Sequence, residues 1–161
     1  MRREPLVFRD YYSACGTRKT CHDVKSLSST IRREAVLTIA SAFAGSGIIN
    51  EGDILIPAPQ HTGRATYMKD IAELVACSTG ARVCDILIRD NEPTLYGIIN
   101  RKAALHMYLQ QEPPEHKGSL YFLDNVVSTG TTYRRAKSLI GDSLKLMTYA
   151  VDYGRYYKEG K

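Results

Sequence analysis

Residues 120–132 read LYFLDNVVSTGTT, an apolar run followed by a turn rich in small hydroxyl residues. The apolar residues Leu120–Leu123 predict a buried strand that ends at Leu123, with Asp124 and Asn125 at its tip. The Ser-Thr-Gly-Thr-Thr turn is expected to open a helix over 131–140. Unpaired N–H groups at the start of such a helix attract anions, and glycine lets the backbone approach one closely. The stretch therefore predicts a phosphate site beside polar groups that can bind sugar hydroxyls.

The rest of the chain alternates between two hydrophobic patterns. Short apolar runs predict three further strands, over 53–57, 82–88 and 144–151. Apolar residues three or four apart predict helices over 27–43, 64–79 and 100–111. This alternation predicts an α/β fold with a parallel sheet, which binds its ligand at the carboxyl ends of the strands. Residues 1–25 show neither pattern and are expected to be irregular.

Composition limits the class of protein. The chain has 161 residues with a net charge of +5, and no Pro/Gly/Ser-rich linker divides it, so a single domain over 1–161 is expected. The basic residues are not gathered on one helix, which fits a polyanionic small molecule, and nucleic acid is not expected as the main ligand. Without a long apolar run or a secretory signal, a cytoplasmic protein with no membrane contact is expected. The four cysteines lack zinc spacing and are expected to be reduced, small apolar residues; the roles of Cys15, Cys21 and His22 stay open.

Residues 120–132 resemble the phosphoribosyl pyrophosphate (PRPP) motif of type I phosphoribosyltransferases. In that motif four apolar residues, two acidic residues and two apolar residues precede a Thr/Gly-rich turn. The resemblance implies that Asp124 and Asn125 are catalytic and hold the ribose hydroxyls, with Asp124 also at the metal. It assigns the 5-phosphate to Ser128, Thr129, Gly130, Thr131 and Thr132. Asn125 departs from the family pattern, because its amide hydrogen-bonds a hydroxyl but brings no charge to stabilise a cationic transition state.

The resemblance covers about 50–145 and is closest to the ComF-like branch. It rests on residues that follow one another in the same order as in that branch: Pro57-Ala58-Pro59, Arg64, Arg89, Thr94 and Arg101. It implies a parallel-sheet type I phosphoribosyltransferase-like core, a small N-terminal hood over 1–25, and a mobile active-site loop over 89–101. It assigns pyrophosphate binding to Thr62, Gly63, Arg64, Arg89, Arg101 and Lys102. A helix-capping turn at Gly63 and solvated surface charge at the basic residues are the alternatives.

A weaker similarity links residues 149–157 to the base site of hypoxanthine-guanine phosphoribosyltransferases. It implies base binding by Val151, Asp152 and Tyr153, and the alternative is that the tyrosines of this segment pack beneath the N-terminal segment.

Together these resemblances imply an enzyme that binds PRPP with Mg²⁺ and transfers the 5-phosphoribosyl group to a nitrogenous base, releasing pyrophosphate. A homodimer is the assembly that many relatives would suggest. The alternative is a non-catalytic PRPP- or nucleotide-binding regulatory protein, or a ComF-like accessory protein of DNA uptake. Release of pyrophosphate with a base separates the first hypothesis from the second.

Overall fold

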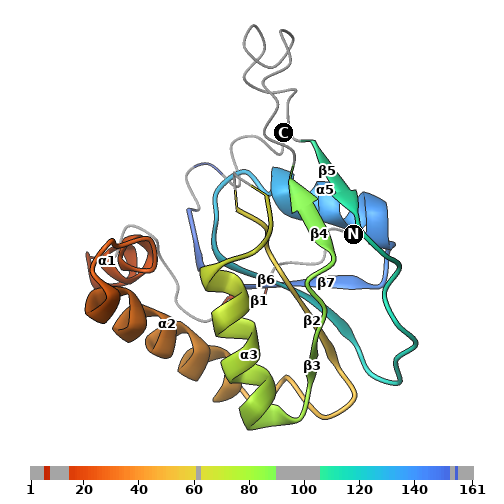
Figure 1. The fold of residues 1–161 in the computed structure, drawn as a ribbon, viewed down its shortest axis with the longest axis horizontal. Coiled ribbons are helices and arrows are strands. Elements are labelled where there is room, and N and C mark those ends of the chain that lie inside the picture. Colours follow the sequence, from red (N-terminus) through yellow and green to blue (C-terminus); the bar gives the residue numbers. More distant parts are fainter. Residues whose placement is uncertain (1–5, 8–14, 61–62, 90–105, 153–154, 156–161) are drawn as a thin grey trace, which may run out of the picture.

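A five-stranded parallel sheet forms the centre of the molecule (Figure 1). The computed structural model describes residues 6–7, 15–60, 63–89, 106–152 and 155. The sheet has the order β1-β7-β6-β2-β3, with strands β1 (Leu6–Val7), β2 (Ile54–Pro57), β3 (Arg82–Val83), β6 (Leu120–Val127) and β7 (Leu144–Val151). The predicted α/β class with a parallel sheet is therefore confirmed.

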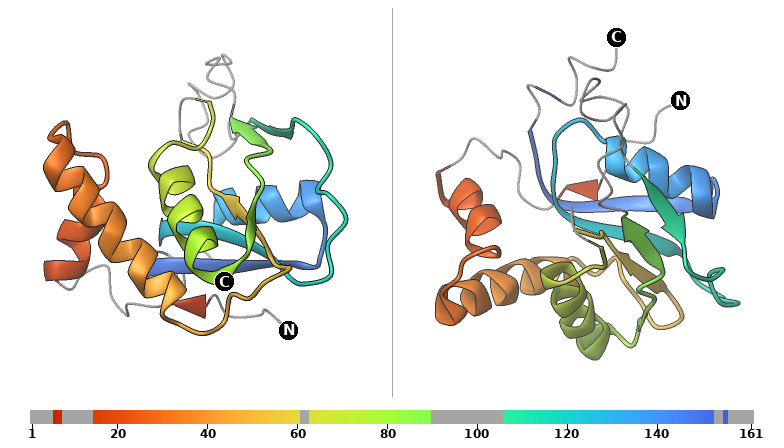
Figure 2. Two further views of the ribbon diagram at one scale, coloured as in Figure 1. Left: turned by 60° about the horizontal axis from the view of Figure 1, so that its bottom comes forward. Right: turned by 45° about the horizontal axis from the view of Figure 1, so that its top comes forward.

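Helices cover both faces of this sheet (Figure 2). On one side lie α1 (Cys15–Asp23), α2 (Ser29–Ala44) and α3 (Tyr67–Thr79), and on the other lies α5 (Thr131–Ile140). Phe122 of β6 meets the ring of Tyr133 on α5, while Phe43 of α2 and Ile71 of α3 are fully buried. Side chains that alternate along a strand point to opposite faces, so β6 contributes to the packing on both sides.

Four expectations about the elements are corrected. The strand expected to end at Leu123 runs on to Val127, because β7 pairs with it as far as Val127↔Val151. The single strand expected over 82–88 is two, since β3 ends at Val83 and β4 (Leu87–Arg89) leaves the main sheet. β4 pairs antiparallel with β5 (Met107–Leu109), where a helix was expected over 100–111; residues 100–105 lie outside the described part of the chain. The segment 1–25, expected to be irregular, supplies β1 and α1.

A buried carboxylate sets the start of the two central strands. Asp53 is 6% exposed, and its carboxylate accepts hydrogen bonds from the backbone N–H groups of Asn50 at 2.8 Å and Ser119 at 2.7 Å. Gly118 packs directly against it, since a Cβ at that position would lie 2.2 Å from Asp53 Oδ1 and 2.8 Å from the Asp53 nitrogen. The close approach leaves no room for a side chain.

Gly118→Ala is therefore expected to lower the free energy of unfolding by about 1–3 kcal/mol, the usual cost of overpacking. Gly16→Ala is the matched control, because a Cβ there meets nothing within 4 Å and α1 gains a better helix former. Urea unfolding followed by circular dichroism measures both. Equal stability of the Gly118→Ala variant and the parent chain would contradict the expectation.

Candidate functional site

A cavity of about 670 Å³ opens at the carboxyl ends of β2 and β6. Its walls come from the α1–α2 turn, the segment after β2, the start of α3, the end of β4, and the loop between β6 and α5. This is the edge at which parallel sheets bind their ligands. The structure thus brings residues from 24 to 132 of the sequence around one hollow.

Asp124 is the carboxylate of β6 that lines this cavity. Burial raises its pKa to about 7, because the charged form is poorly solvated. Hydrogen bonds from the backbone N–H groups of Asn125 (2.8 Å) and Val126, and the charges of Lys25 and Arg89, act in the opposite direction and favour the carboxylate. Near neutral pH this group therefore takes up or releases a proton when a ligand changes its surroundings.

Asn125 lines the same cavity, but its amide is engaged with the protein. The residue is 2% exposed, its Nδ2 donates to the Cys21 carbonyl at 3.2 Å, and its Oδ1 accepts from the Tyr67 hydroxyl at 3.5 Å. The Cys21 thiol donates to the Asn125 carbonyl at 3.6 Å, and burial raises the pKa of that thiol to about 12, so it stays neutral. These bonds hold α1 and α3 against β6. Hydroxyl binding by Asn125 stays a prediction.

The predicted phosphate loop joins β6 to α5. Ser128 and Thr132 line the cavity, and Gly130, with φ 74°, adopts the left-handed conformation immediately before the helix. Gly130 has no side chain to cap α5, and the Thr131 N–H donates to Thr129 Oγ1 at 3.4 Å. The positive end of the helix dipole lies at this loop. The hydroxyls of Thr129 and Thr131 lie 2.8 Å apart. The turn thus has the backbone shape that a phosphate cradle needs.

Arg134, which sequence reasoning missed, fixes that loop from the first turn of α5. Its guanidinium donates to the Thr129 carbonyl at 2.8 Å and to Thr131 Oγ1 at 3.3 Å. Arg134 follows Gly130 by four residues, a spacing that has no special meaning on an exposed helix. The sequence therefore gives no separate signal for this contact.

The residues predicted to bind pyrophosphate are only partly brought together. Arg89 lines the cavity, its N–H donates to the Gly63 carbonyl at 2.9 Å, and burial lowers the pKa of its guanidinium. Gly63 has φ 115°, a conformation suited to glycine, and Arg64 is exposed and does not line the cavity. Thr62, Arg101 and Lys102 lie outside the described residues, as does the loop expected over 89–101 beyond Arg89.

Two of the predicted base-binding residues, Val151 and Asp152, lie at the end of β7 and do not line the cavity. Val151 is 1% exposed, and the N–H of Asp152 donates to the Val127 carbonyl at 2.9 Å. The Asp152 carboxylate pairs with Arg155 at 3.7 Å. Tyr153 is outside the described residues, so base binding by this segment stays a prediction.

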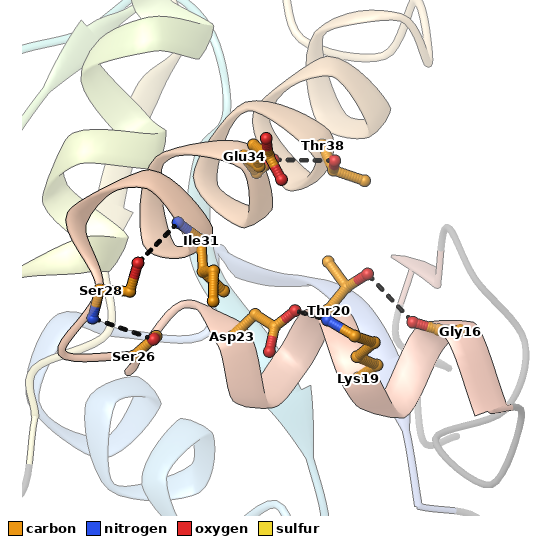
Figure 3. Close-up of polar contacts among 9 residues, drawn as sticks. All are labelled: Gly16, Lys19, Thr20, Asp23, Ser26, Ser28, Ile31, Glu34 and Thr38. Carbon is orange, nitrogen blue, oxygen red and sulfur yellow. Dashed lines mark hydrogen bonds and ion pairs between the residues drawn. The ribbon is translucent and has the colours of Figure 1, made fainter.

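The N-terminal helices add cavity residues that sequence reasoning missed. Lys25 follows α1, and Arg32 stands in the first turn of α2, where its guanidinium donates to the Ser26 carbonyl at 3.4 Å. The corner between the helices is fixed by Ser28, whose Oγ accepts from the Ile31 N–H at 3.5 Å while its own N–H donates to Ser26 Oγ at 3.2 Å (Figure 3). In the sequence, only the resemblance that implies an N-terminal hood over 1–25 indicated that this region faces a ligand.

Two features are absent from the residues that the structure describes. Among the residues that the structure describes, no group of three or more His, Cys, Asp or Glu side chains is placed to bind a metal ion. Within the same residues, no helix has the length and apolar character needed to cross a membrane.

Comparisons with known proteins give a distant likeness in structure. No family model matches the chain, and no curated protein matches its sequence. A solved structure described as "Structure of the allosteric regulatory enzyme of purine biosynthesis" is 14% identical, with a TM-score of 0.47. The match covers 70% of this chain and 25% of that one, so our chain corresponds to about a quarter of that enzyme.

Proposed function

We propose that this chain binds PRPP together with Mg²⁺ and transfers its 5-phosphoribosyl group to a nitrogenous base, as type I phosphoribosyltransferases do. The observation that supports this most directly is the cavity itself. It collects a half-buried carboxylate, a hydroxyl-rich loop at a helix N-terminus and an arginine at the carboxyl edge of a parallel sheet. Those three groups match the ribose, the 5-phosphate and the pyrophosphate of PRPP.

In this proposal each part of PRPP has its own partner. Asp124 accepts hydrogen bonds from the ribose hydroxyls, for which a carboxylate is a stronger acceptor than an amide. The loop 128–132 receives the 5-phosphate at the N-terminus of α5. Arg89 and the backbone at Gly63 face the pyrophosphate.

The reaction breaks the bond between ribose C1 and the pyrophosphate oxygen and forms a bond from C1 to a ring nitrogen of the base. The electron pair of the broken bond leaves with pyrophosphate, and positive charge develops at C1 and the ring oxygen. When bound, Mg²⁺ would supply charge neutralisation on the pyrophosphate. In this proposal the negative charge of Asp124 stabilises the developing cation.

Calorimetric titration with PRPP tests the proposal. The parent chain is expected to bind PRPP with Mg²⁺ and to lose most of that affinity without it. Asp124→Ala is expected to weaken binding by about 10–100-fold, because the ribose loses charge-assisted hydrogen bonds. Asp142→Ala is the matched control, since Asp142 is an exposed carboxylate after α5 that pairs with Lys137. Failure of the parent chain to bind millimolar PRPP would contradict the proposed function.

One observation favours a second candidate, a PRPP-binding protein without turnover. The neighbour of Asp124 is an asparagine whose amide holds α1, so the site presents one carboxylate from this strand. A panel of nitrogenous bases scored for pyrophosphate release separates the two. The enzyme releases pyrophosphate with at least one base, whereas the non-catalytic protein binds PRPP and releases none.

A further inference from the structure

The cavity has a third cationic wall that PRPP leaves without a partner. The loop before α5 and the arginine of β4 face the two anionic ends of PRPP under the proposed function. Lys25 and Arg32 line the same cavity but come from the corner between α1 and α2. Figures 1 and 2 place α1 and α2 on the side of the molecule away from α5. Lys25 and Arg32 therefore belong to a different part of the cavity wall from the loop 128–132.

Within the described ranges, neither of these cations forms an ion pair, although the charge of Lys25 lowers the pKa of Asp124. The ion pairs there are Lys19–Asp23, Lys69–Glu73, Lys137–Asp142 and Arg155–Asp152. Asp70 of α3 also lines the cavity, yet it forms no ion pair with Arg32 among these residues. Arg32 uses one nitrogen to bond the Ser26 carbonyl, which orients the guanidinium and leaves other N–H donors for a ligand.

The bond to Ser26 also makes this corner a defined structure. Ser28 caps α2 through the Ile31 N–H, and Ser26 Oγ accepts from the Ser28 N–H (Figure 3). A cation on such a corner loses little further conformational entropy when it binds an anion, so more of the interaction energy contributes to affinity. Lys25, one residue before Ser26, adds a flexible ammonium group beside it.

We infer that Lys25 and Arg32 bind a carboxylate on the acceptor, so that the acceptor is a nitrogen heterocycle bearing a carboxylate group. The inference rests on the proposed function, because it assigns the ribose and phosphate groups of the same cavity to PRPP. The inference names the substrate class: a heterocycle that carries a carboxylate is preferred over the same heterocycle without that charge. A guanidinium and an ammonium on one wall suit a carboxylate, which each can hydrogen-bond while neutralising its charge.

Binding of paired mononucleotides tests this without requiring turnover. Orotidine 5′-phosphate and uridine 5′-phosphate share ribose, phosphate and ring, and differ by one carboxylate; nicotinate and nicotinamide mononucleotides form a second pair. Calorimetry on the parent chain is expected to show about tenfold tighter binding of the acidic member of at least one pair. The double variant Lys25→Gln/Arg32→Gln is expected to lose that preference while it still binds the neutral member.

Arg33→Gln is the matched control, because Arg33 is the next residue of α2 and does not line the cavity; it lines a neighbouring groove, to which Arg32 and Asp70 also contribute. It is expected to keep the preference for the acidic nucleotide. Equal or tighter binding of the neutral members by the parent chain overturns the inference and leaves the proposed function standing if PRPP binds. An equal loss of acidic and neutral nucleotides in the double variant also overturns it, since the pair would then act on the ribose or phosphate. Failure to bind PRPP or any nucleotide overturns both.

Discussion

Asn125→Asp is expected to lower the free energy of unfolding by about 3 kcal/mol at pH 8, although it restores the second acid of the PRPP motif. The amide of Asn125 is 2% exposed and donates to the Cys21 carbonyl at 3.2 Å. A carboxylate at that place has no donor for the carbonyl, and its charge stands beside Asp124 without a cation of its own. The variant therefore gains a buried, unpaired charge and loses the bond that holds α1.

The loss depends on pH in a defined direction. Burial and the neighbouring acid raise the pKa of a carboxyl at position 125, so the variant is nearer to the parent chain at pH 5 and falls further behind as pH rises. Urea unfolding at pH 5 and pH 8 measures the difference. Asn125→Ala is the control, because it removes the same hydrogen bonds without adding charge, and its loss stays constant with pH. An aspartate variant as stable as the parent at pH 8 would show that the amide bond to Cys21 is dispensable.

The second large effect is a pH dependence of stability that comes from Asp124. Its pKa is about 7 in the folded chain, against an ordinary value of 3.8, so the folded state keeps a proton that the unfolded state has lost. Between pH 4 and pH 7 the folded state therefore binds more protons, and stability falls as pH rises. The slope approaches about 1.4 kcal/mol per pH unit, and it flattens above pH 7, where both states are ionised.

Asp124→Asn is expected to remove this slope and to be more stable than the parent chain above pH 7. Chemical denaturation at half-unit steps from pH 4.5 to 8.5 measures the slope in both proteins. Asp142→Asn, at an exposed carboxylate, should leave it in place. If the parent chain and the Asp124→Asn variant showed the same slope between pH 5 and pH 7, the raised pKa of Asp124 would be contradicted.

Periodicity predicted the elements that carry the phosphate loop. The bounds expected for α5 and β7 are those observed, because Gly130 and Gly141 flank α5 and a run of mostly apolar residues marks β7. α3 begins at Tyr67, three residues later than expected, since residues 63–66 form the loop after β2. The extension of β6 to Val127 depends on its pairing with β7, which no local pattern reveals.

Other features depended on contacts between distant parts of the chain. Met107 and Tyr108 fit one face of a helix as well as they fit a strand, and pairing with β4 selects the strand, with Met107 buried and Tyr108 exposed. Asn125 in a motif suggests a ligand, and nothing local indicates that Cys21, 104 residues earlier, accepts its amide hydrogen. Asp124 and Ser128 could be assigned to the site because the first lies in the last half of β6 and the second directly follows that strand.

The order of the strands also bears on how this chain can assemble with copies of itself. The two outermost strands of the main sheet, β1 and β3, are each two residues long and offer little unpaired backbone for another molecule. At β3, Arg82 donates to the Glu115 carbonyl at 2.9 Å and so ties the segment before β6 to that margin. Growth of a continuous intermolecular sheet at β3 is therefore disfavoured. A self-association of this protein that spares β3 would have to use another part of its surface, such as its helices, its loops or the edge of a different strand.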